Sequence, residues 1–184
     1  MRAAVCGPST LPGLDERPPG MYGIHLHDIA AASRNFLAAV RDGSPQAFLA
    51  AVASVPSRLL GLARETARQM IVEASDALYP DAIFVLHAGI LTDLAVETGA
   101  PVVVHVSATD LEVAAGRPSL RRLVASAIGS SDRVVASDAA TAALLRQGWL
   151  GDESCDVWAI DEDAANRVAA VCRAACARRR GENP

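Results

Sequence analysis

The sequence predicts an α/β protein built on one doubly wound, parallel sheet of the Rossmann-like type. Two observations carry this prediction. Short apolar strands alternate with amphipathic helices, an order that favours parallel strands joined by right-handed crossovers. Residues 81–87 are almost continuously apolar, which is typical of a strand in a sheet covered on both faces. The 184 residues suffice for one sizeable core, so we expect a single domain over residues 1–184.

The first part of the chain contains the weaker signals. Residues 2–6 are expected to form the first strand, and a loop rich in glycine and proline follows over residues 7–23. Asp28 then stands where it would cap a helix that ends at Gly43, because apolar residues between them recur at helical spacing. The next strand candidate is residues 47–52.

The rest of the chain alternates more clearly. Residues 57–75 are ambiguous, because the segment begins like a helix while residues 69–75 also fit a strand. We then expect strands at residues 81–87, 102–106, 132–137 and 155–160. We expect helices at residues 90–97, from Pro118 onward, at 138–147 and at 161–180. The last helix has an acidic first turn and a basic last turn, which suits its dipole, and we expect it to close the domain.

The composition is that of a globular protein without an affinity for polyanions. Hydrophobic residues make up 51% and charged residues 21% of the chain, and the formal net charge of −4 argues against a nucleic-acid or anionic-membrane partner. The longest apolar stretch is interrupted by His87 and Asp93, so we expect no membrane span. The chain does not begin like a signal peptide, and no two cysteines have C-x-x-C spacing. We therefore expect a cytoplasmic protein with reduced thiols.

Polar residues gather where two of the expected strands end. In the stretch PVVVHVSATDLE, Ser107, Thr109 and Asp110 follow the strand directly and His105 lies near its end. His87 ends the preceding strand in the same way. Because ligands of parallel α/β sheets bind outside the carboxyl ends of the strands, we expect these residues to line a pocket. The alternative is that His105 is an interior histidine with its hydrogen bonds satisfied and Asp110 is a helix cap.

A second polar group lies near the end of the glycine-rich loop. Gly23 precedes His25, His27 and Asp28, and the sheet edge would bring them to the same rim. Two histidines and a carboxylate suit zinc or iron, but Asp28 is equally explained as a helix cap, and we expect no metal site. The sequence contains no phosphate-binding G-x-x-x-x-G-K loop and no G-x-S-x-G nucleophile elbow.

Residues 80–150 carry a longer pattern. PDAIFVLHAGILTDLAVETGAPVVVHVSATDL is followed by a helix and then by SDRVVASDAATAALLRQGW. This order resembles the N-terminal half of glycosyltransferases with the GT-B fold, and most of all the large retaining family 4. That family has a strand PD-h-h-h-x-H, then G-x-P-h-h-h-T-h-H-G-x-D-h, then A-D-x-h-h-h-x-S, where h is hydrophobic. The resemblance implies one GT-B half, which in the family binds the acceptor.

Two features depart from the family pattern. Ser107 occupies the family's usual histidine position, and His105 lies two residues earlier. In the family a second half binds the nucleotide-sugar donor and carries a Glu-x7-Glu motif, but only a strand and a closing helix are expected after Trp149. Glu65 and Glu73 have that spacing in the wrong half, which we attribute to chance.

These observations lead to three functional hypotheses. The resemblance implies an acceptor-binding subunit, or a reduced form, of a retaining glycosyltransferase acting on a hydroxylated small molecule, with no tightly bound cofactor. A partner protein would then supply the nucleotide-sugar site. The second hypothesis is a stand-alone biosynthetic enzyme that uses histidine and aspartate as acid or base. The third is a non-catalytic binding protein that forms a homodimer through the former inter-domain face.

The candidate residues are shared by the two enzymatic hypotheses. The catalytic candidates are His25, His27, His87 and Asp110. The substrate-binding candidates are Gly23, His105, Ser107, Thr109 and Ser137.

Overall fold

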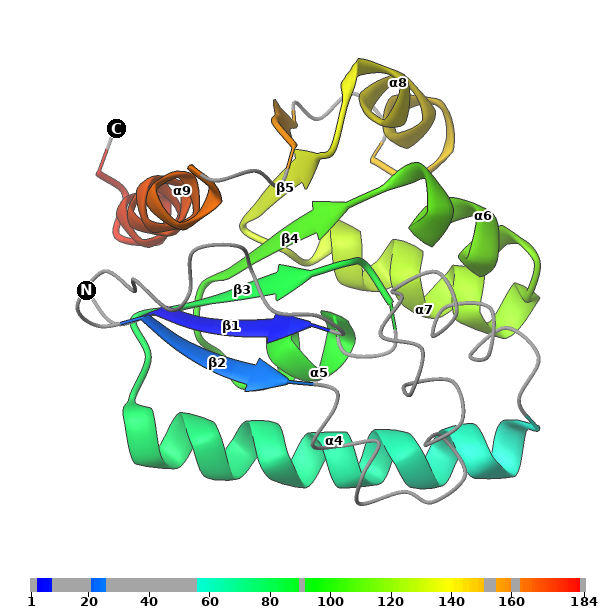
Figure 1. Cartoon of the computed structure of the whole chain (residues 1–184), viewed down its shortest axis with the longest axis horizontal. Helices are drawn as coiled ribbons and strands as arrows, with labels where there is room; N and C mark the ends of the chain where they lie inside the picture. The colour runs from blue at the N-terminus through cyan, green and yellow to red at the C-terminus, as the bar shows by residue number, and fades with distance from the viewer. Residues whose placement is uncertain are drawn as a thin grey trace.

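The chain forms a parallel sheet with helices on both faces, as the sequence predicts (Figure 1). This architecture comes from a computed structural model that describes residues 3–7, 21–25, 56–89, 92–150, 155–159 and 163–182. The helix expected over residues 28–43 and the strand expected at 47–52 lie outside the described residues. The predicted α/β, Rossmann-like class is confirmed.

Within the described residues, the sheet has six strands in the order β2-β1-β3-β4-β5-β6, and every neighbouring pair is parallel. Its strands are β1 (Ala3–Gly7), β2 (Met21–His25), β3 (Ala82–Leu86), β4 (Val102–Val106), β5 (Arg133–Ala136) and β6 (Asp156–Val157). After β2 the chain returns past β1 and continues on its other side. The carboxyl ends of β1 and β3 therefore flank the point where the winding reverses, which is where such sheets bind ligands.

Six helices are described between and after these strands. They are α4 (Ser57–Leu78), α5 (Thr92–Glu97), α6 (Ala108–Ala115), α7 (Pro118–Gly129), α8 (Ala139–Gly148) and α9 (Ala164–Arg179). Figure 1 shows α4 beginning on the side toward which the strands point and running back against them. Within the described residues, none of the helices is long and apolar enough to cross a membrane.

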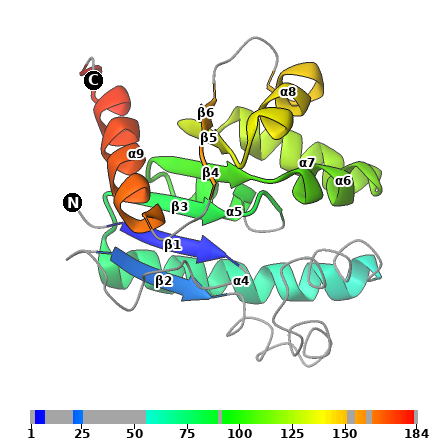
Figure 2. The ribbon, with the colours of Figure 1, turned by 45° about the horizontal axis from the view of Figure 1, so that its top comes forward.

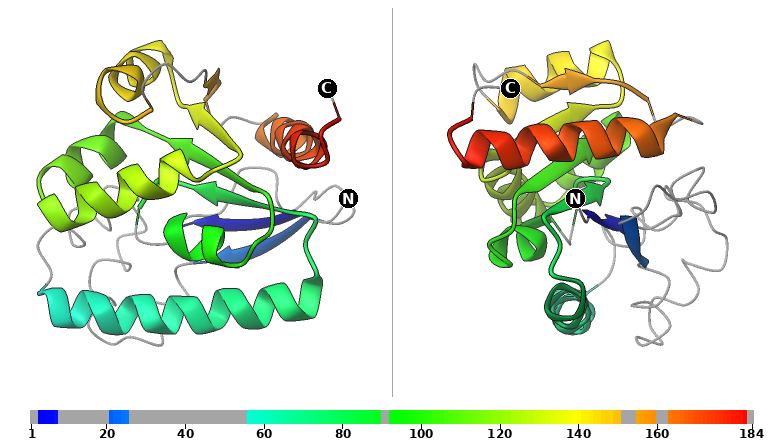
Figure 3. Two further views of the ribbon diagram at one scale, coloured as in Figure 1. Left: turned by 180° about the vertical axis from the view of Figure 1, so that it is seen from behind. Right: turned by 90° about the vertical axis from the view of Figure 1, so that its left-hand side faces the viewer.

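Alternating strand residues build two separate cores, because successive side chains of a strand point to opposite faces. Ile83, Val85 and Val104 lie on the face covered by α4 to α8. Phe84 and Val103 lie on the other face and pack against α9. Figure 2 and Figure 3 show α9 on one side of the sheet and α4, α5 and α7 on the other. A sheet buried on both faces explains why β3 and β4 are apolar in nearly every position.

Several sequence-based predictions need correction. The strand considered for residues 69–75 is wrong, because the apolar residues of that segment form one face of the long helix α4, as Ala67 and Ile71 show. The loop expected through residue 23 ends earlier, because Met21–His25 pairs with β1. The helix α6 was anticipated only through the alternative that Asp110 is a helix cap, and the last strand has two residues where six were predicted.

The last helix, α9, is held at its C-terminal end to the amino edge of the sheet. Arg179 Nε donates to Asp132 Oδ1 at 2.7 Å, and Cys176 Sγ donates to the Asp81 carbonyl at 3.2 Å. The basic last turn predicted for this helix is confirmed, but its first turn contains no acidic residue. Cys172 is also buried against the sheet, and burial raises the pKa of its thiol to about 12. Its thiol is therefore an apolar packing group at neutral pH.

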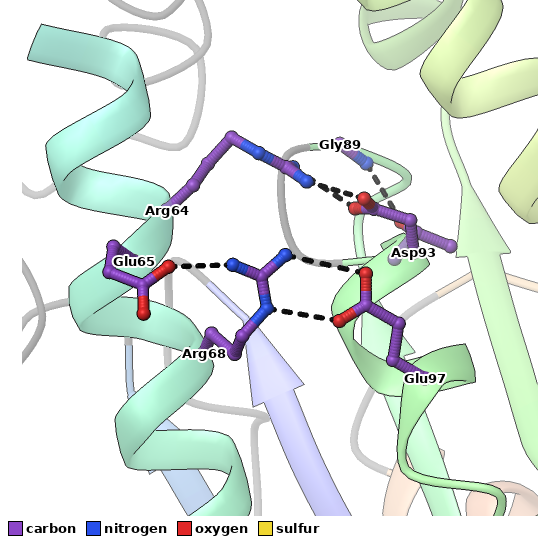
Figure 4. Close-up of polar contacts among 7 residues, drawn as sticks. Arg64, Glu65, Arg68, Gly89, Asp93 and Glu97 are labelled. Atoms are coloured by element: carbon purple, nitrogen blue, oxygen red, sulfur yellow. Dashed lines mark hydrogen bonds and ion pairs between the residues drawn. The ribbon is translucent and has the colours of Figure 1, made fainter. Parts of the chain in front are cut away.

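Two arginines of α4 attach this helix to α5 (Figure 4). Arg64 forms a two-pronged ion pair with Asp93, in which the NH1–Oδ1 distance is 3.0 Å. Arg68 donates to Glu97 at 3.0 Å through Nε and to Glu65 of its own helix at 2.7 Å. The first pair is mostly shielded from solvent, whereas the Arg68 contacts are exposed.

We expect Asp93→Asn to lower the free energy of unfolding by about 1 kcal/mol, because the partly buried guanidinium of Arg64 loses its charged acceptor. The matched control is Glu65→Gln, which removes an exposed contact and should change stability by less than about 0.5 kcal/mol. Urea unfolding of the three proteins measures both values. Equal effects of the two substitutions would contradict a structural role for the Arg64–Asp93 pair.

Candidate functional site

The carboxylate of Asp110 is the centre of the candidate site. Ser107 leaves β4 in an extended conformation and forms the N-cap of α6, and Asp110 occupies the third helical position. The Ser107 backbone N–H donates to Asp110 Oδ2 at 2.7 Å, while Ser107 Oγ accepts from the Asp110 backbone N–H at 3.3 Å. This reciprocal capping box fixes the carboxylate at the carboxyl edge of the sheet.

Asp110 also reaches the neighbouring strand. Its Oδ2 accepts from the Ala88 backbone N–H at 3.3 Å, and its Oδ1 lies 3.2 Å from His87 Nδ1. The Asp110 side chain is fully buried. One carboxylate thus joins the ends of β3 and β4, and its own oxygens are shielded from solvent.

His87 has an unusual backbone conformation. Its φ is +71°, in the left-handed region that residues other than glycine seldom adopt. This turn follows the last residue of β3 and directs the next backbone N–H toward Asp110. Such conformations cost free energy and persist where surrounding contacts hold them, as Asp110 does here through both the His87 ring and the Ala88 N–H.

The contact with Asp110 defines the chemistry of the His87 ring. A carboxylate oxygen only accepts hydrogen bonds, so Nδ1 is the donor and carries the proton. The lone pair of a neutral His87 is then on Nε2. The side chain retains 17% of its exposure, so it is the member of the pair that a ligand can reach. A histidine oriented by a buried carboxylate is suited to accept a proton from a hydroxyl group.

His105 lies beside this pair on the α9 face of β4. It is only 2% exposed, and its ring centroid lies 5.7 Å from Trp158, 6.4 Å from Phe84 and 6.2 Å from His87. Within the part of the chain that the structure describes, neither ring nitrogen has a hydrogen-bond partner. The expected alternative of a satisfied interior histidine is therefore wrong: the ring is interior but its polar atoms are not paired.

The surroundings of His105 keep its ring neutral. Its pKa is lowered to about 4, first by burial and second by the neighbouring His87. The Asp110 carboxylate and the Trp158 backbone oppose this shift only in part. The Trp158 backbone lies close enough to favour the charged ring, but not in hydrogen-bonding geometry.

The end of β5 adds hydroxyl groups to the same edge. The Ser137 backbone N–H donates to the Val106 carbonyl at 2.9 Å, which places Ser137 beside the end of β4. Its Oγ donates to Asp138 at 2.9 Å and lies 3.1 Å from the Thr141 hydroxyl. Asp138 caps α8 by accepting from the Thr141 N–H at 2.7 Å. Ser137 is thus tied into the helix cap, and only partly buried.

The remaining candidates are more scattered. Gly23 lies inside β2, opposite Val5, and not in a loop at the strand end as expected. His25 ends β2 at the level of Gly7, and β1 separates β2 from β3. Thr109 is half-buried in the first turn of α6. The candidates His27 and Asp28 lie outside the described residues, and the residues that are described contain no group of three metal ligands.

One hollow of the described surface lies next to His105, because Trp158 lines the hollow and also contacts the His105 ring. It has a volume of about 380 Å³ and lies between β6 and α9. Trp158 lines it and also stacks on Phe84, with ring centroids 5.9 Å apart. Arg133 and Asp156, joined by an ion pair at 3.1 Å, add charge to this hollow.

The fold and this geometry define a class of site: a histidine–aspartate pair at the carboxyl edge of a parallel α/β sheet, with a buried neutral histidine beside it. No protein-family model and no curated protein matches the sequence. The alternative that Asp110 is a helix cap is confirmed, but sequence reasoning missed its partner Ser107, although Ser107-x-x-Asp110 has the spacing of a capping box. It also missed Trp158, for which the sequence offers no signal because its contact with His105 arises only through space.

The buried neutral state of His105 predicts a loss of stability in acid. The unfolded chain binds a proton at this residue below about pH 6.5, whereas the folded chain does so only near pH 4. Relative to a His105→Phe variant, the wild type should therefore lose about 3 kcal/mol of unfolding free energy as the pH falls from 6.5 to 4. Urea unfolding across that range measures the difference, and parallel pH profiles of the two proteins would contradict the buried neutral state.

Proposed function

We propose that the chain is the acceptor-binding domain of a retaining glycosyltransferase and binds a hydroxylated small molecule at the carboxyl ends of β3 and β4. The observation that carries the proposal is the His87–Asp110 pair, with Nδ1 and Oδ1 3.2 Å apart. His87 follows β3, whose carboxyl end flanks the winding reversal of the sheet, where ligands of such folds bind. The nucleotide-sugar donor would be bound by a partner protein.

The pair suits the demands of transfer to a hydroxyl group. The acceptor oxygen must be aligned with the sugar carbon, and its proton must leave as the new bond forms. Nε2 of His87 would accept a hydrogen bond from that hydroxyl and take up its proton. Asp110 is the positioning residue in this scheme, because it holds the ring orientation and would stabilise the imidazolium. In a retaining transfer, stabilisation of the departing diphosphate would fall to the donor-binding partner.

The sequence pattern of residues 80–150 supports sugar transfer over other reactions at the same edge. The resemblance places Ser107 at the family's histidine position, and in this chain the Ser107 side chain caps α6. Among the described residues, His87 and His105 are the imidazoles of β3, β4 and the turns that follow these two strands, whereas His25 ends β2 beyond β1. We propose that His87 takes the acceptor-facing role.

A stand-alone enzyme is the second candidate, and the same pair favours it. A histidine oriented by a buried carboxylate can abstract a proton in many reactions of alcohols and carbonyl compounds. The two candidates differ in whether the chain needs a partner to bind an activated sugar. Nucleotide binding by the isolated chain separates them.

Thermal unfolding of the full chain with added ligands tests the proposal. The probes are neutral polyols (glycerol, myo-inositol, glucose and N-acetylglucosamine), UDP-glucose, GDP-mannose and the free nucleotides. A polyol that binds the native state adds about 2.7 kcal/mol at a hundredfold excess over its Kd, so a clear rise in Tm is expected. We expect this rise with at least one polyol, its loss in His87→Ala, and no rise with any nucleotide.

The outcomes separate the candidates. A rise with nucleotide sugars alone would contradict the division of acceptor and donor between two proteins. No rise with any polyol would contradict the acceptor-binding role. The control is Glu65→Gln, which removes an exposed contact on α4 outside the candidate site and should keep the polyol response.

A further inference from the structure

His105 has a property that packing alone does not explain. Its ring is 2% exposed, it contacts the rings of Phe84 and Trp158, and both of its nitrogens lack a hydrogen-bond partner within the described residues. The remaining four residues of β4 are all valines. A buried polar group without a partner lowers stability, and an apolar ring of similar shape would avoid that cost. An unpaired buried group in a native protein calls for an explanation, and a functional role is one such explanation.

The position of His105 suggests what that explanation is. Its ring meets the ring of His87 edge to face, with the two planes at 89° and the centroids 6.2 Å apart. His87 in turn is held by Asp110 and is the partly exposed member of the site. A ligand that hydrogen-bonds to His87 therefore lies next to the His105 ring, whose nitrogens are unpaired.

We propose that His105 is a specificity-determining residue that hydrogen-bonds an uncharged hydroxyl group of the ligand bound at His87. This inference rests on the proposed function and names a feature of its substrate. The ring nitrogens are covered in the free protein, so a side-chain movement of half-buried His87 or Trp158 must accompany binding. The ligand hydroxyl then supplies the partner that the folded chain lacks.

The chemistry of the surroundings selects an uncharged group. A neutral imidazole has one donor and one acceptor nitrogen, and a hydroxyl can satisfy either one. A phosphate or carboxylate would bring a charge into these aromatic surroundings, and a neutral ring cannot compensate that charge because the burial of His105 opposes its protonation. Neutral polyols should therefore bind better than their phosphorylated counterparts.

The test compares wild type with two variants at neutral pH. His105→Phe keeps an aromatic ring of similar shape without polar atoms, and His105→Gln keeps one donor and one acceptor group. Calorimetry measures the Kd of the neutral polyol that gives the largest Tm shift, and of its phosphate ester. Tm without ligand is also measured for each protein. If His105 only packs in the core, His105→Phe should not combine a higher Tm with weaker polyol binding.

The expected result has two parts. His105→Phe should raise Tm by about 2–4 °C, because an unpaired polar group is removed. It should also weaken polyol binding about tenfold, because the ligand loses a hydrogen bond. His105→Gln should not raise Tm and should keep the Kd within about threefold of wild type. Wild type should prefer the neutral polyol to its phosphate ester.

Three results would overturn the inference while leaving the proposed function intact. They are wild-type affinity in His105→Phe, equal loss of affinity in both variants, and tighter binding of the phosphate ester. A fall in Tm for His105→Phe would show that the ring nitrogens already have partners, which also overturns it. If no polyol binds the wild type, the proposed function fails and the role of His105 fails with it.

Discussion

The candidate site depends on one buried carboxylate, that of Asp110. Burial of a charged group is costly unless hydrogen bonds replace its water. Asp110 has three such contacts, from the backbone of Ser107, the backbone of Ala88 and the ring of His87. These contacts come from two neighbouring strands, so the charge is accommodated only when β3 and β4 end side by side. The same contacts hold His87 in its left-handed conformation, and this links the local strain of the site to the register of the sheet.

The sheet makes this arrangement rigid. β3 and β4 are buried over their whole length, with α4 to α8 on one face and α9 on the other. At the opposite edge, Asp132 accepts from the Val102 N–H at 2.8 Å and from Arg179 of α9. The amino ends of β4 and β5 are thereby fixed to the last helix, while their carboxyl ends carry polar groups. The amino edge thus carries the contacts to α9, and the carboxyl edge, where parallel α/β sheets usually bind ligands, carries the candidate site.

The fold was predictable where local pattern and tertiary environment agree. The apolar runs that became β3 and β4 are short, rich in β-branched residues and typical of strands buried on both faces, and Pro118 marked the start of α7. Prediction failed for residues 69–75, because a short apolar segment fits a strand as well as one face of a helix. Gly23 was misplaced because pairing with β1 overrides its weak preference for a strand.

The site was predictable in part for a similar reason. His87, Ser107 and Asp110 follow strands directly, so the parallel topology alone brings them to one edge. The contact between Asp110 and His87 was not predictable, since it spans 23 positions and depends on the turn after β3. The His105 ring is unpaired because aromatic rings surround it: Phe84 lies on β3, and Trp158 follows β6. Such contacts follow from packing and not from spacing.

The most direct test is the tautomer of His87, observed by two-bond proton–nitrogen NMR correlation in mildly alkaline buffer. A carboxylate that orients the ring requires the proton on Nδ1 and the lone pair on Nε2. We predict that tautomer in the wild type and its loss in Asp110→Asn, with Ser137→Ala as a control that leaves it unchanged. Observation of the Nε2–H tautomer in the wild type would contradict the account, because His87 would then have no lone pair on Nε2 to accept a proton from a ligand.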